Sequence, residues 1–164
     1  MPLSDPQVSR SRIHSRRIEI QGFIRDDGLL DLDARLTDQK DIDYPLASGV
    51  RKAGDPVHDL FVRVTVDRDF FILDAEASSE WVPYPDACGT IAPAYRRLVG
   101  LNLVRGFRRT VGEMFADVRG CAHLTELLAS LPTAAIQAWA TFVRALADGD
   151  GTPPLRLMRL GTNL

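Results

Sequence analysis

Residues 18–36, IEIQGFIRDDGLLDLDARL, decide the fold of this chain. Apolar residues or glycine occupy every second position on both sides of Asp26-Asp27-Gly28, and mostly charged or polar residues lie between them. Alternation with a period of two is typical of strands with one buried face. Asp-Gly suits the positive φ angles of a type I′ turn, so this stretch predicts a β-hairpin.

A second hairpin is predicted around the polar turn at residues 67–69. Apolar residues recur at positions 60, 62, 64 and 66, and residues 70–77 form the returning strand. The connection at residues 38–56 contains prolines and glycines without a regular pattern. Loops of this length in compact domains are usually functional or mobile, and this one could form a lid over a pocket.

The second half is predicted to be helical, because two prolines at residues 83 and 85 end the strand pattern. Expected helices span residues 88–99, with a start near Ile91, 107–115, 124–131 and 133–146. Pro132 is expected to end or kink the third helix, and Thr133 to cap the fourth. The expected fold class is α+β: a four-stranded antiparallel sheet from two β-hairpins, packed on one face by three to four C-terminal helices.

The composition fits one domain over residues 1–164, with a mobile arm at 1–12 and a C-terminal tail at 148–164. The net charge of −2, with both signs interspersed, argues against nucleic acid as a partner. No apolar run approaches the length of a membrane span. Two cysteines without a signal peptide predict free thiols and a cytoplasmic location. The tail could dock on the domain itself or on a partner, and so could form an oligomer.

Candidate chemistry centres on Gly120-Cys121-Ala122-His123-Leu124. A helix N-terminus favours a thiolate and lowers the pKa of a cysteine. Cys121 and His123 could bind zinc or iron, completed by Cys88 and His58. Two alternatives remain: a thiol packed as a small apolar residue beside a hydrogen-bonded histidine, or a reactive thiol without metal.

His58 is a candidate general acid or base. Adjacent strand residues point to opposite faces, so Asp59 is not expected to orient it, and the partner is expected to be Asp38 or Asp86. A histidine satisfied by backbone groups is the alternative.

Arg105 and Arg109, with Tyr84, form the expected binding set for a small acidic substrate, because guanidinium groups match carboxylates and phosphates. The alternative is a solvated helix face.

Two function classes follow. The first is a small-molecule enzyme of the lyase, hydratase or isomerase type, using His58, Cys121 and His123 directly or through a metal. The second is a non-catalytic metal-binding or accessory protein. The long loop favours the enzyme.

Several short motifs follow one another along the chain: RRIE (16–19), RDDG (25–28), LTDQK (36–40), VHDL (57–60), PYPDAC (83–88), LVGL (98–101) and GCAHLTELL (120–128). Together they resemble the bacterial domain of unknown function 2889 family over roughly residues 12–140. The resemblance implies a bacterial cytoplasmic protein and no settled activity. The family pattern has Thr in place of Ala122 and an aromatic residue in place of Leu30; neither difference removes a candidate group.

The layout alone is similar to iron–sulfur scaffold proteins of the NifU type: a hairpin, a first cysteine at Cys88, then helices and a second cysteine at Cys121. The third cysteine of that arrangement is missing.

Overall fold

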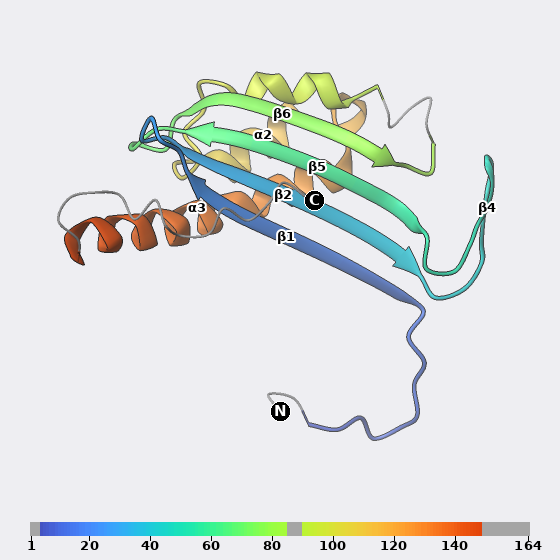
Figure 1. Cartoon of the computed structure of the whole chain (residues 1–164). Helices are drawn as coiled ribbons and strands as arrows, with labels where there is room; N and C mark the ends of the chain where they lie inside the picture. The colour runs from blue at the N-terminus through green and yellow to red at the C-terminus, as the bar shows by residue number, and fades with distance from the viewer. Residues whose placement is uncertain (1–3, 85–89, 149–164) are drawn as a thin grey trace.

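Four long strands form one antiparallel sheet in the computed structural model, which describes residues 4–84 and 90–148. The strands are β1 (His14–Ile24), β2 (Leu30–Lys40), β5 (Pro56–Val66) and β6 (Ile72–Trp81), in the order β1-β2-β5-β6. Figure 1 shows the helices gathered on one side of this sheet. Both predicted hairpins and the α+β class are confirmed.

The turn between β1 and β2 differs from the expected type I′ turn. The backbone N–H of Arg25 donates to the carbonyl of Leu29 at 2.9 Å, which leaves a three-residue loop. Of these three residues only Gly28 has a positive φ, of 81°. A single left-handed glycine is the usual geometry of a three-residue hairpin loop, so the glycine is needed at this one position.

The connection predicted to lack regular structure contains a small β-ribbon. β2 continues to Lys40, and β3 (Tyr44–Leu46) pairs with β4 (Gly49–Arg51). Strands of three residues are too short to show an alternating pattern, which explains why the sequence did not indicate them. The ribbon extends from one end of the main sheet (Figure 1).

The helical half consists of η1 (Ala92–Leu98), α2 (Phe107–Met114), η2 (Asp117–Arg119) and α3 (Ala122–Asp148). η1 is a 3₁₀-helix with Pro93 in its first turn, and it starts close to the expected residue. The part of the predicted first helix at 88–89 and the tail at 149–164 lie outside the described residues. No helix in the described part of the chain is both long and apolar enough to cross a membrane.

α3 is one continuous helix, so the prediction of separate helices around Pro132 was wrong. Proline inside a helix costs roughly 3 kcal/mol, but Leu128, Leu131 and Ala135 on either side of it are fully buried against the core. The hydroxyl of Thr133 does not cap a new helix. It donates back to the carbonyl of Ser130 at 3.2 Å, within the same helix.

The core lies between the sheet and the helices. It combines the even-numbered apolar residues of β2 and β5 with the leucines of α3: Leu30, Leu32, Leu36, Leu60, Val62, Val64, Val66, Leu124, Leu127, Leu128 and Leu131. The other face of the sheet is not covered by these helices and carries paired charges, such as Arg63 with Asp33 at 2.6 Å. Each strand therefore has one core face and one open face.

Candidate functional site

At one end of the sheet, the positions of β1, β2 and β5 that face the helices change from apolar to polar residues. In the strand register, Arg16 of β1 lies opposite Asp38 of β2, and Asp38 lies opposite His58 of β5. Asp38 and His58 continue the even-numbered positions that are apolar further along β2 and β5, so they face the helices. The site is the polar continuation of the core.

Asp38 is the centre of this row, with a side chain that is only 4% exposed. Arg16 donates from Nε and Nη2 to the two carboxylate oxygens, each at 2.8 Å. His14 donates to Oδ1 at 2.9 Å, and His58 donates from Nδ1 to Oδ2 at 3.0 Å. Burial opposes ionisation of the carboxyl, but the hydrogen bonds from Arg16 and His14 outweigh it and lower the pKa of Asp38 to about 2.

The N-terminus of α3 covers this row and brings Cys121 with it. The carbonyl of Cys121 accepts the backbone N–H of Thr125 at 2.9 Å, which makes Cys121 the residue that caps the helix. Its sulfur lies 3.9 Å from Nδ1 of His123. Burial opposes ionisation of the thiol, but His123 and the backbone N–H groups of Leu124 and His123 outweigh it and lower the pKa of Cys121.

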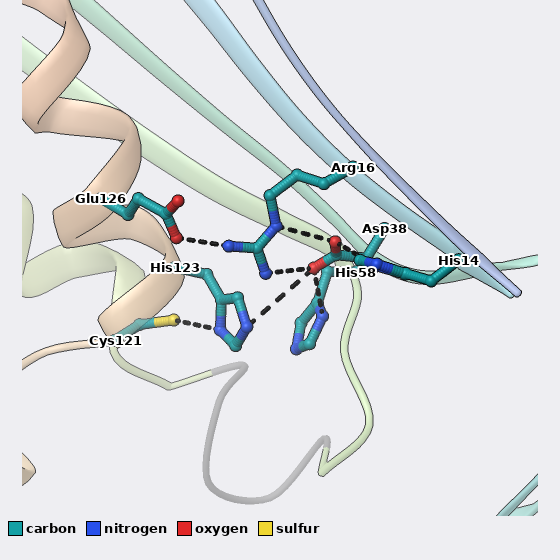
Figure 2. A network of polar contacts seen from close by, with 7 residues as sticks. All are labelled: His14, Arg16, Asp38, His58, Cys121, His123 and Glu126. Atoms are coloured by element: carbon teal, nitrogen blue, oxygen red, sulfur yellow. Dashed lines mark hydrogen bonds and ion pairs between the residues drawn. The ribbon is translucent and has the colours of Figure 1, made fainter. Parts of the chain in front are cut away.

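His123 lies between the thiol and the carboxylate, and the ring of His58 lies against it at an angle of 31° between the planes. Their ring centroids are 3.8 Å apart, and Nε2 of His123 is 4.0 Å from Oδ2 of Asp38. Burial, with the nearby positive charge of His123, lowers the pKa of His58, whereas the contact with Cys121 raises the pKa of His123 despite its burial. Figure 2 shows the continuous path from the Cys121 sulfur through His123 to Asp38, with His58 beside it.

Arg16 also joins the sheet to α3. Its Nη1 donates to Oε2 of Glu126, one turn after His123, while its other nitrogens hold Asp38. The guanidinium is therefore engaged by two carboxylates from two different elements (Figure 2). This bridge keeps the start of α3 above the row formed by Arg16, Asp38 and His58.

Three of these residues form a group that could hold a metal ion. One donor atom each from Asp38, His58 and His123 lies within 4.8 Å of the others. Both oxygens of Asp38 already accept hydrogen bonds from the guanidinium of Arg16. A divalent cation would have to displace that positive charge to bind the carboxylate.

Of the site residues expected from the sequence, the structure brings His58, Cys121 and His123 together. Asp38, one of the two partners expected for His58, does contact it, while Asp59 binds Arg35 on the open face at 2.8 Å. Two other expected groups, Cys88 and Asp86, fall outside the described residues.

The expected substrate-binding residues are not gathered at this cluster. Leu103 bonds the carbonyl of Phe70 at the β5–β6 turn, so Arg105 follows the opposite end of the sheet from His58. The eight residue steps along β5 from His58 to Val66 span about 27 Å. Arg109 is exposed in the first turn of α2. Tyr84 is 57% exposed and follows β6 at the end of the sheet where His58 lies.

The sequence reasoning missed His14, Arg16 and Glu126. The signal for the first two was present: they continue, at even positions, the alternation of Ile18 and Ile20. Glu126 lies one helical turn after His123, at i+3, a spacing that places both on one helix face.

A hollow of about 580 Å³ lies on the open face of the sheet, away from the cluster. Charged residues line much of it, including Glu19, Asp33, Arg35 and Glu76, and Trp81 lies at its edge. Arg35 is paired with Asp59 and Arg63 with Asp33, so the lining keeps an excess of negative charge from Glu19, Glu76 and Glu80.

Taken together, the fold and the cluster define a small α+β protein in which one end of a half-covered antiparallel sheet carries a His-Cys-Asp site. The chain belongs to the family described as Protein of unknown function (DUF2889), which matches residues 14–137. That range includes every residue of the cluster. Neither the curated proteins nor the solved structures contain a match to the chain.

Proposed function

We propose that this protein is a small-molecule enzyme of the lyase, hydratase or isomerase type, in which His58 and His123 exchange protons with the substrate. The observation that carries the proposal is the pair of adjacent imidazole rings, with centroids 3.8 Å apart, a carboxylate bonded to one and a thiol beside the other. These three reaction types each need one group that removes a proton and one that supplies a proton.

The two histidines suit opposite tasks. His58 uses Nδ1 for Asp38, so Nε2 is the nitrogen available to remove a proton from a substrate carbon. His123 next to the Cys121 sulfur suits the protonated state and can donate a proton to the leaving group or to an adjacent carbon. Environments that push the pKa values of two neighbouring groups apart are the usual way to assign a base and an acid.

The proton count balances for each reaction type. In a lyase, His58 gains the proton from carbon and His123 loses its proton to the departing group; a hydratase runs the same steps in reverse. In an isomerase, His58 removes a proton from one carbon and His123 gives its proton to a different carbon of the same molecule. The Cys121 thiolate remains the counter-ion of His123 and forms no bond to the substrate.

The charges of the cluster do not favour an acidic substrate. Arg16 is already engaged by Asp38 and Glu126, and the arginines expected to bind an acid, Arg105 and Arg109, do not belong to the cluster. The substrate that best fits is a neutral molecule with an acidic C–H next to a carbonyl group, which a single histidine base can deprotonate.

The chain has three histidines, so their proton resonances can be titrated by NMR and assigned with His14→Gln, His58→Gln and His123→Gln. We expect His58 to titrate below and His123 above the ordinary value near 6.5. Cys121→Ser should lower the pKa of His123, because it removes the thiolate. If His58 and His123 both titrate near 6.5, the assignment of base and acid is wrong.

Activity is tested with neutral β-hydroxy carbonyl compounds, whose loss of water gives a conjugated product with strong ultraviolet absorbance. His58→Gln and His123→Gln should abolish turnover, and Arg105→Gln should leave it unchanged. The metal-binding alternative makes a different prediction. It requires stoichiometric zinc or iron by elemental analysis, lost in His58→Gln and in His123→Gln, and that result would overturn the metal-free mechanism.

A further inference from the structure

Tyr95 of η1 is fully buried and places its hydroxyl group against the backbone of Cys121. The oxygen accepts the Cys121 N–H at 2.9 Å, and the hydroxyl donates to the Cys121 carbonyl at 3.1 Å. Thr125 Oγ1, at 3.4 Å, is a further neighbour. One phenol therefore contacts both backbone groups of the residue that carries the thiol.

The ring of Tyr95 is fixed by a second element. It stacks on Phe115, which directly follows α2, with ring centroids 4.3 Å apart and an angle of 10° between the planes. Such stacking leaves the hydroxyl little freedom to move. Burial also raises the pKa of Tyr95, so the hydroxyl keeps the proton that it donates.

The position of the Cys121 backbone determines where the thiol lies and which groups it contacts. The sulfur receives the N–H groups of His123 and Leu124 and lies beside the His123 ring, contacts that depend on where the helix begins. Among the described residues, the titratable groups that face the thiol are His123 on its own helix and Tyr95 on η1. Arg16 and Asp38 act on the neighbouring His123.

We infer that Tyr95 is a positioning residue, which sets the Cys121 thiolate at the N-terminus of α3 and so keeps His123 protonated. The inference rests on the proposed function, in which His123 is the acid. Tyr95 touches neither histidine ring in the described contacts, so its effect passes through the backbone of Cys121. Loss of the hydroxyl would leave the buried N–H of Cys121 without this acceptor and allow the turn to shift.

The test compares Tyr95→Phe with the parent in a Cys88→Ser background, where Cys121 is the one remaining thiol. The rate of alkylation by iodoacetamide, measured against pH, reports the pKa of Cys121. We expect a low thiol pKa in the parent and a rise in Tyr95→Phe. At a pH below the thiol pKa of both proteins, a rise of half a pKa unit lowers the reaction rate about threefold. The NMR pKa of His123 should fall in the same variant.

Tyr44→Phe is the matched control, because it removes a tyrosine hydroxyl from β3, outside the contacts of the cluster. It should leave the pKa of Cys121 unchanged. If Tyr95→Phe lowers the thermal midpoint but also leaves the thiol pKa unchanged, Tyr95 is only structural and the inference is overturned. If the parent itself has an ordinary thiol pKa, the proposed function fails instead.

A measurement on the unsubstituted chain covers the case in which Tyr95→Phe does not fold. The Cys121 amide proton should exchange slowly with solvent, because it is bonded to a buried phenol. Rapid exchange of this proton would overturn the inference without any variant.

Discussion

Asp38→Asn is the substitution that probes the centre of the cluster. Asparagine keeps the size of the side chain but removes the charge that Arg16, His14 and His58 contact. The carboxylate is 4% exposed, so solvent screens these contacts weakly. Arg16 would retain Glu126 as its remaining carboxylate partner. We expect a loss of stability that depends on pH.

The size of the effect follows from the pKa of Asp38, which is about 2 in the folded protein. An aspartate in an unfolded chain has a pKa of about 3.9, and each pH unit of difference corresponds to about 1.4 kcal/mol. Ionised Asp38 therefore stabilises the fold by about 2.5 kcal/mol. Because the folded pKa is depressed, this contribution is complete above the unfolded pKa and disappears as the pH falls through about 2.

Urea unfolding over pH 7 to pH 2 measures this contribution. The free energy of unfolding of the wild type should fall by about 2 kcal/mol more than that of Asp38→Asn between pH 5 and pH 2, because the folded carboxyl is still half ionised at pH 2. Asp41→Asn, which removes an exposed ion pair with Arg12, is the control and should run nearly parallel to the wild type. A constant difference between wild type and Asp38→Asn at every pH would refute the reasoning.

Two further predictions concern packing, and both are read from urea unfolding at neutral pH. Leu32→Ala should lower the free energy of unfolding by about 2–5 kcal/mol, because Leu32 is completely buried beneath the helices. Gly22→Ala should cost about 1–3 kcal/mol, because a Cβ atom there would lie 2.6 Å from the Cβ of Ala138. The double variant with Ala138→Gly should recover part of that loss; no recovery would contradict the predicted contact.

The hairpins were predictable because their information is local. The alternation of residues 18–36 and the Asp-Gly turn specify the strands without reference to the rest of the chain. The continuity of α3 was not predictable in this way. Proline is a local signal for a helix end, but burial of Leu128, Leu131 and Ala135 against a distant sheet outweighs it.

The site was predictable only in part, for a related reason. Cys121, His123 and His58 attract attention by residue type, and the alternation of faces correctly separates His58 from Asp59. The placement of Arg16 beside Asp38 requires the register between β1 and β2, which is a property of pairing rather than of one segment.

β5 carries His58 on its helix face and Asp59 on its open face. The pairing of β5 is irregular near these residues, with β2 at Asp38/Gln39 and with β6 at Asp59/Leu60. A deletion of one residue later in β5 would exchange the two faces, turning a carboxylate inward and the imidazole outward. Insertions in the ribbon at residues 41–55 carry no such penalty. Variants of this chain can therefore differ in length at the ribbon. The register of β5 against β2 must be kept, because it places His58 beside Asp38.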